Sequence, residues 1–269
     1  MKLIVEYEGS GFEGWQVQPA GHRTVQGTIE AAIAQVCQER VRVAGSGRTD
    51  AGVHAEGQVA SVRLETAMEP ARLCRALNGV LPRDVSVCEV SVVADDFDAR
   101  RDAIGKLYRY RVWNGPRRSP LRERRWLCLE RPLDIAALKK AASHVVGSHD
   151  FASFQAAGSD VMTSLRTLRT VDVLGESGGP LVIDFEGTGF LRHMVRILVG
   201  TLLQVASGRR EPDDMERILA GRDRSLAGPT APAHALTLVQ VQYPGDETLR
   251  EWNGGIPGLG GIPNQNPQG

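Results

Sequence analysis

The sequence has no long hydrophobic run, and this absence excludes an integral membrane protein with helical spans. No segment approaches the roughly 20 consecutive apolar residues that such a helix requires. The N-terminus, from Met1 to Glu6, also lacks the charged and apolar regions of a secretory signal. Hydrophobic residues make up 42% of the 269-residue chain, which is typical of a globular protein with one large or two ordinary domains. We therefore expect a cytoplasmic protein.

Cysteine is scarce, and its spacing excludes a disulfide framework and a zinc site. The four cysteines lie far apart and beside aliphatic residues: Cys37, Cys74, Cys88 and Cys128. They form no Cys-x-x-Cys pair, and no histidine follows at the spacing of a metal ligand. The sequence therefore predicts reduced thiols in the interior and no metal.

Two short motifs imitate cofactor or metal sites but are incomplete. Gly187-Thr188-Gly189 opens like a dinucleotide-binding turn, but Arg192 occupies the position of the third glycine. His54-Ala55-Glu56 resembles the His-x-Glu of zinc deaminases, but no Pro-Cys-x-x-Cys partner exists. We therefore expect no cofactor.

The chain has no excess of either charge, with 32 basic and 32 acidic residues, although nucleic-acid-binding proteins usually carry excess Lys and Arg. The distribution is uneven. Between Arg100 and Arg131 there are eleven basic residues, at 100, 101, 106, 109, 111, 117, 118, 122, 124, 125 and 131, and three acidic ones, at 102, 123 and 130. Aromatic residues at 108, 110, 113 and 126 lie among them. This run predicts an RNA-binding surface, with an ordinary solvated face as the alternative.

Hydrophobic periodicity predicts an α/β (α+β) fold. Strands are expected at 2–7, 41–44, 57–64, 85–93, 105–113, 167–174, 181–186 and 236–243, and helices at 25–38, 70–78, 134–146, 191–206 and 212–220. This order predicts two related split β-α-β halves, ferredoxin- or RRM-like, that form a mixed, mainly antiparallel central sheet flanked by helices. We place the halves at residues 1–104 and 105–244. Residues 245–269, rich in Gly, Pro, Asn and Gln, are expected to be a disordered tail.

Three local features refine the helices. Thr24 is the expected N-cap of the first helix, and Pro70 is expected in the first turn of the second. The helix at 191–206 carries one apolar stripe, which predicts a core-facing side, with Arg192, His193 and Arg196 at its N-terminal end.

A glycine-rich run from Gly45 to Ala55 presents one carboxylate, Asp50, between Arg48 and His54. Glycine at 45, 47 and 52 permits positive φ and the close approach of a ligand to the backbone. An aspartate is ionised at neutral pH and is able to act as nucleophile or base. Asp50 is therefore the first candidate for catalysis, although an isolated Arg-x-Asp is more often part of an Asx turn.

The string Gly45-Ser46-Gly47-Arg48-Thr49-Asp50-Ala51-Gly52-Val53-His54-Ala55 resembles the active-site loop of the tRNA pseudouridine synthase A family. The resemblance extends over roughly residues 2 to 244, in the segments 7–16, 24–27, 97–100, 108–110, 150–154, 190–196 and 227–234. Two positions depart from the family pattern: Glu8 stands where aspartate is usual, and Ala235 where glycine is common. Both lie outside the loop.

The resemblance implies the isomerisation of uridine to pseudouridine in the anticodon stem-loop, at tRNA positions 38 to 40, by a homodimer without a cofactor. It implies that Asp50 is catalytic, that Arg196 forms an ion pair with it, that Arg48 lies near a flipped nucleotide and that Tyr108 packs against the target base. Without the resemblance, both arginines could be surface residues, and Tyr108 and Tyr110 could be core residues on one face of a strand.

A function of another class stays open at this stage. A non-catalytic RNA-binding module with split β-α-β folds would also use strand aromatics and basic residues, but it would not need Asp50. The sequence alone does not decide whether Asp50 attacks C1′ or first accepts a proton.

Overall fold

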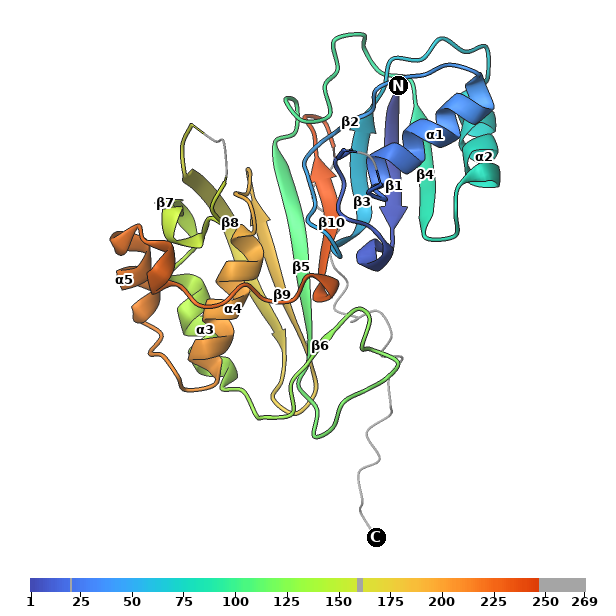
Figure 1. The fold of residues 1–269 in the computed structure, drawn as a ribbon. Coiled ribbons are helices and arrows are strands. Elements are labelled where there is room, and N and C mark those ends of the chain that lie inside the picture. The colour runs from blue at the N-terminus through green and yellow to red at the C-terminus, as the bar shows by residue number, and fades with distance from the viewer. Residues whose placement is uncertain (20, 159–161, 247–269) are drawn as a thin grey trace.

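The computed structural model describes residues 1–19, 21–158 and 162–246, and one large sheet forms its centre (Figure 1). The first part of the chain contains β1 (Lys2–Tyr7), α1 (Val25–Cys37), β2 (Ala44–Gly45), β3 (His54–Ser61), α2 (Pro70–Val80) and β4 (Val85–Ser91). The second part contains β5 (Gly105–Trp113), β6 (Leu127–Cys128), α3 (Ile135–Ser143), β7 (Gly147–Asp150), β8 (Leu165–Gly175), β9 (Pro180–Gly187), α4 (Met194–Ala206), α5 (Asp214–Gly221) and β10 (Leu236–Gln242).

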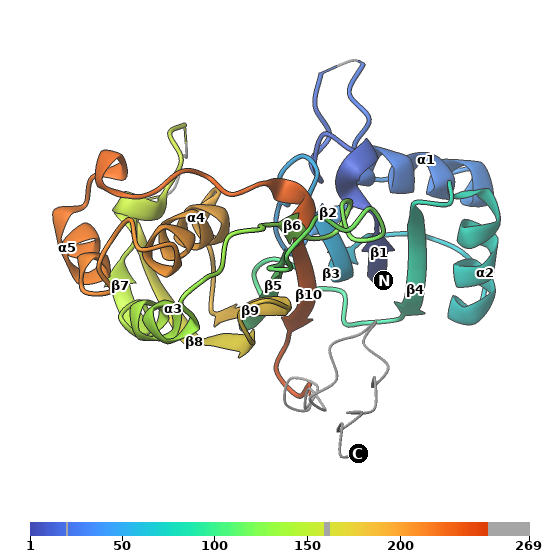
Figure 2. The same cartoon turned by 90° about the horizontal axis from the view of Figure 1, so that it is seen from below.

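The ten strands of the sheet confirm the predicted mixed, mainly antiparallel architecture. Their order is β4-β1-β3-β10-β5-β9-β8-β7, with β2 beside β3 and β6 beside β5. The last strand, β10, lies at the centre, where it runs parallel to β3 and antiparallel to β5. Helices α1 and α4 cover the same face of the sheet (Figures 1 and 2). The division into halves at residue 104 stays a prediction.

Local signals explain where several elements begin. The hydroxyl of Thr24 accepts a hydrogen bond from the backbone N–H of Gly27, so the predicted N-cap is confirmed. Pro70 opens α2, as predicted. The strand expected at 57–64 instead spans His54–Ser61, because pairing with β1 ends at Ser61 while the apolar pattern continues to Leu64. The strand expected at 41–44 is reduced to Ala44–Gly45.

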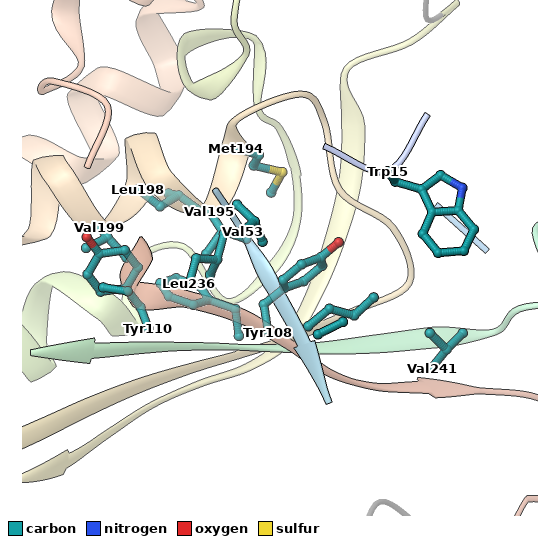
Figure 3. Packing of buried hydrophobic residues seen from close by; sticks show 14 of the residues in the cluster. Trp15, Val53, Tyr108, Tyr110, Met194, Val195, Leu198, Val199, Leu236 and Val241 are labelled. Carbon is teal, nitrogen blue, oxygen red and sulfur yellow. The ribbon is translucent and has the colours of Figure 1, made fainter. Parts of the chain in front are cut away.

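The side of strand β5 that faces the helices and the apolar stripe of α4 form the core beside the Asp50 loop (Figure 3). Leu198, Val199 and Leu202 of α4 are fully buried, so the predicted core-facing stripe is confirmed. Tyr110 of β5 lies among them with no exposed surface, and its hydroxyl donates a hydrogen bond to the carbonyl oxygen of Pro232 at 3.0 Å. Tyr110 is therefore a core residue.

Two arginines of the basic run are buried, which corrects the expectation that the whole run is a solvent-facing basic surface. Arg109 binds the carboxylate of Asp184 on β9 through two hydrogen bonds of 2.8 and 2.7 Å. Arg111 donates to Thr237 on β10 and to Glu56 on β3, each at 2.7 Å. Because alternate residues of a strand point to opposite faces, these side chains lie on the face of β5 opposite Tyr108 and Tyr110, beside polar partners on neighbouring strands.

We expect Asp184→Asn to lower the free energy of unfolding by about 3 kcal/mol, because it removes the carboxylate that pairs with the buried Arg109 guanidinium. Urea unfolding followed by circular dichroism measures the change. Asp172 lies opposite Asp184 on β8 and is exposed. Asp172→Asn, the matched control, should change stability by less than about 0.5 kcal/mol. Equal unfolding midpoints for the two variants would contradict the expectation.

No helix in the described ranges is both long and apolar enough to cross a membrane. The predicted tail, residues 245–269, lies outside the described residues from 247 onward. At its start, the backbone N–H of Asp246 donates to the carbonyl oxygen of Tyr243 at 3.1 Å, so the described chain ends in a turn.

Candidate active site

Asp50 lies in the loop that connects β2 to β3, and backbone hydrogen bonds fix the loop around it. The carbonyl oxygen of Asp50 accepts a hydrogen bond from Val53 at 3.1 Å, and the N–H of Gly52 donates to Phe12 at 3.2 Å. Gly52 has a φ of +79°, which favours glycine. The Asp50 side chain keeps 23% of its surface exposed, so its carboxylate is partly open to solvent.

The N-terminal segment 9–15 supports this loop from the other side. The N–H of Trp15 donates to the carbonyl oxygen of Thr49 at 3.1 Å. Gly14 has a φ of +96°, and a Cβ there would lie 2.7 Å from the same oxygen. A Cβ at Gly9 would lie 2.0 Å from the carbonyl oxygen of Val53. The glycines of this segment therefore let its backbone pack directly against the Asp50 loop, a role that the sequence pattern did not reveal.

Arg196, in the first turn of α4, contacts Asp50 across 146 residues of sequence. Its Nη1 lies 3.0 Å from Oδ2 of Asp50. Its Nε donates to the carbonyl oxygen of Ala231 at 2.8 Å, and the backbone N–H of Ala231 donates to the backbone carbonyl oxygen of Arg196 at 3.0 Å. The guanidinium is thus held on both sides, and it presents a fixed positive charge to the carboxylate.

His193 also faces Asp50, which sequence reasoning did not anticipate. Its Nε2 lies 3.5 Å from Oδ1 of Asp50. Burial lowers the pKa of His193; Asp50 opposes this change, and Arg196 with other nearby arginines adds to it. The predicted helix at 191–206 begins instead at Met194, because His193 adopts a left-handed φ of 60° and so interrupts the helical backbone.

Tyr108 lies on the helix-facing side of β5, close to the same loop. Its ring packs edge-on against Phe190, with 4.9 Å between ring centroids. Burial raises the pKa of Tyr108, and the nearby Tyr7 and Asp50 add to the increase, so the phenol stays protonated at neutral pH. Tyr7 in turn contacts the hydroxyl of Thr49 at 2.8 Å. Figure 3 shows the Tyr108 ring on the side of β5 that faces Met194 and Val195.

Arg48 is not brought into contact with Asp50. Its side chain is exposed, and it makes no hydrogen bond or ion pair with any residue that the structure describes. Of the four site residues named from the sequence, Asp50 and Arg196 are paired, Tyr108 lies close to them, and Arg48 is exposed on the same loop.

His54 joins the site to both parts of the chain. Its Nδ1 accepts a hydrogen bond from the N–H of Gly9 at 3.0 Å, and its Nε2 lies 2.8 Å from the carbonyl oxygen of His234. This pair of contacts requires the neutral ring with the proton on Nε2. Burial lowers the pKa of His54, which is consistent with that form. His54 is therefore built into the structure behind the Asp50 loop.

The arrangement supplies one partly exposed carboxylate, a fixed guanidinium beside it and a neutral phenol. A carboxylate in this setting is able to attack an electrophilic carbon or accept a proton. Within residues 1–19, 21–158 and 162–246, no group of three or more His, Cys, Asp or Glu side chains is arranged to hold a metal ion.

Comparison with known proteins gives consistent matches. A family model described as tRNA pseudouridine synthase matches residues 3–101 and 141–244. The tRNA pseudouridine synthase A of Myxococcus xanthus is 45% identical over 243 residues, which cover 90% of this chain and 91% of that protein. The protein of the same name from Shouchella clausii is 45% identical over 244 residues, with 90% and 93% covered. A chain in the crystal structure of a Cbf5-Nop10-Gar1 complex is 14% identical, with a TM-score of 0.33 and coverage of 77% of this chain and 55% of that chain.

Proposed function

Because the chain belongs to the tRNA pseudouridine synthase family and is an isomerase of tRNA uridine, we propose that it acts on the anticodon stem-loop, at tRNA positions 38 to 40. The observation that carries the assignment of its active site is the 3.0 Å ion pair between Asp50 and Arg196. This pair joins the glycine-rich loop to the first turn of α4, beside the buried Tyr108.

The reaction requires one protein group that is able to form and later break a bond to C1′ of the ribose, or to remove a proton from the substrate and return one. The bond between N1 of uracil and C1′ breaks, the base turns, and a bond between C5 and C1′ forms. C5 loses its proton and N1 gains one, so no oxidant or reductant is consumed. We propose Asp50 as the group that attacks C1′ or removes the first proton, with the Arg196 guanidinium holding its carboxylate in place at 3.0 Å.

The target nucleotide must leave its stack to reach Asp50, at a cost of a few kcal/mol. We propose that the base then packs against Tyr108, whose neutral ring lies beside the Asp50 loop. Arg48 is exposed and without a partner among the described residues, so its side chain is available to the extruded nucleotide. From the family resemblance we also propose a homodimer and a cytoplasmic location.

The test of the proposed function is to incubate the protein with unmodified tRNA transcripts and to map pseudouridine by carbodiimide modification and primer extension. We expect new pseudouridine at positions 38, 39 or 40 and at no other uridine. Pseudouridine confined to other positions would overturn the proposed specificity. RNA binding without any pseudouridine would favour the non-catalytic RNA-binding module.

The loop between β5 and β6 is the part of the basic run that is suited to bind RNA. Four of its arginines are exposed: Arg117, Arg118, Arg124 and Arg125. The loop is anchored at Trp113, whose Nε1 donates to the carbonyl oxygen of Arg117 at 3.0 Å and whose ring lies 4.2 Å from the Arg122 guanidinium. Exposed cations on an anchored loop are able to contact phosphates without contacting the reacting base.

Replacing these four arginines with Gln should weaken tRNA binding by about tenfold or more and reduce the dependence of the Kd on salt. The single-turnover rate at saturating RNA should change little. Binding titrations at several salt concentrations measure both effects. The matched control replaces four exposed arginines of the first half with Gln, namely Arg63, Arg72, Arg75 and Arg83. Equal effects of the two sets would show that the loop is an ordinary solvated face.

A further inference from the structure

Lys106 points from β5 toward the Asp50 loop and has no role in the reaction described above. It lies two residues before Tyr108, so both side chains extend from the same face of the strand, about 7 Å apart along it. Its ammonium group donates a hydrogen bond to the carbonyl oxygen of Ser46 at 2.7 Å. Lys106 thus lies at the start of the loop that carries Asp50.

The charge of Lys106 has no counter-charge in the described part of the chain. Its one contact there is the neutral carbonyl of Ser46, so two of its three N–H donors stay available. Burial, together with the nearby Arg100, lowers the pKa of Lys106 to about 8. Burying a charged ammonium group without a carboxylate partner costs free energy, and a bound anion would reduce this cost by supplying a negative charge.

The neighbouring residues leave room for the ammonium group. Gly47 follows Ser46, and a Cβ at Gly47 would lie 2.7 Å from Nζ of Lys106. Any side chain at that position would therefore displace the ammonium group. Glycine at position 47 therefore allows the Lys106 ammonium group to lie against the backbone of the Asp50 loop.

A second cation, Arg100, lies beside the start of the same loop. The backbone N–H of the preceding Ala99 donates to the hydroxyl of Ser61 on β3 at 3.2 Å, and Ser61 pairs with Ala44, two residues before Ser46. Arg100 ends the segment Phe97-Asp98-Ala99-Arg100, and its backbone is fixed by a hydrogen bond of 2.8 Å from its N–H to the carboxylate of Asp98. Its side chain is exposed and contacts no carboxylate among the described residues. Burial is the larger cause of the lowered pKa of Lys106, and the positive charge of Arg100 adds to it.

We propose that Lys106 and Arg100 form a binding site for one phosphodiester of the RNA backbone, next to the uridine that reacts at Asp50. The proposal rests on the proposed function, because it is the bound RNA that supplies the phosphodiester. A base packed on Tyr108 brings its own sugar and phosphates to the same face of β5, within reach of Lys106. The phosphate supplies the missing negative charge and accepts the free N–H donors of Lys106.

The experiment compares stem-loop RNAs in which one phosphate at a time, on either side of the target uridine, is replaced by an uncharged methylphosphonate. The Kd and the single-turnover pseudouridine yield are measured for the wild-type protein and for Lys106→Gln. With the wild-type protein we expect one of these replacements to weaken binding by about tenfold. With Lys106→Gln the same replacement should change the Kd less than about twofold, because its partner is already absent.

Three further variants separate phosphate binding from support of the loop. Arg100→Gln changes an exposed side chain, and it should reduce the effect of the same methylphosphonate. Lys106→Arg keeps the charge and should keep that effect. Lys139→Gln, at an exposed lysine on α3, is the matched control and should behave as the wild type.

If each methylphosphonate weakens binding equally in the wild type, Lys106→Gln and Arg100→Gln, the inference is overturned, and Lys106 only anchors the carbonyl of Ser46. The wild type would then still form pseudouridine, so the proposed function would stand. If the wild type forms no pseudouridine in any of these RNAs, both the proposed function and this inference fail.

Discussion

Replacing Asp50 with Asn should remove pseudouridine formation while leaving the fold and most of the RNA affinity in place. The amide keeps the shape of the side chain, but it cannot bond to C1′ as a carboxylate or accept a proton at neutral pH. We expect the single-turnover rate to fall by at least about 1,000-fold. The Kd should change less than about threefold, because most of the affinity comes from phosphates away from the reacting base.

The measurement uses excess folded protein over radiolabelled stem-loop RNA, so that weak binding is not mistaken for lost chemistry. Asp172→Asn, an exposed aspartate on β8, is the control for the same chemical change and should keep the wild-type rate. If Asp50→Asn converts its bound RNA at a rate within tenfold of the wild type, Asp50 is not the catalytic residue.

Arg196→Ala should lower the single-turnover rate by about 100-fold, because it removes the positive charge beside Asp50 and the side-chain hydrogen bond to the carbonyl oxygen of Ala231. The side chains of Arg196 and Asp50 are 16% and 23% exposed, so the pair is partly solvated. We therefore expect a loss of stability of about 1–3 kcal/mol, less than for a fully buried pair. Thermal unfolding measures the stability.

Arg196→Lys separates the two roles of this side chain. A lysine keeps the charge near Asp50 but cannot also donate from Nε to the carbonyl oxygen of Ala231. Its rate should lie between those of the wild type and Arg196→Ala. Wild-type rates for both variants would show that Asp50 needs no cationic partner.

The elements with a regular apolar pattern could be predicted from the sequence, and those without one could not. The strand at Gly105–Trp113 matches its predicted bounds because it is rich in aromatic and apolar residues, which alternate with arginines from Tyr108 to Val112. The strand at Gly147–Asp150 was missed, since its four residues, Gly-Ser-His-Asp, contain no apolar residue. It exists because it pairs with β8, a long-range contact that a local pattern does not report.

The site divides in the same way. Asp50 stands out in its glycine-rich run, but its contact with Arg196 joins distant segments, and only the family resemblance pointed to it. The positions of His193 and Gly14 beside the loop depend on tertiary packing. The buried pairs of Arg109 and Arg111 could not be predicted either, because an arginine on a strand looks the same in sequence whether it faces solvent or an aspartate.

The central place of β10 has a consequence for synthesis of the protein on the ribosome. This strand ends at Gln242, yet it pairs with both β3 and β5 and therefore closes the sheet between them. His234, just before it, receives the contact from His54 behind the Asp50 loop. Domains generally fold as units during synthesis, and long-range strand pairing forms late. A nascent chain whose residues 236–242 are still inside the ribosome cannot bring together the two sides of the proposed active site, so we expect no activity toward RNA until these residues have emerged.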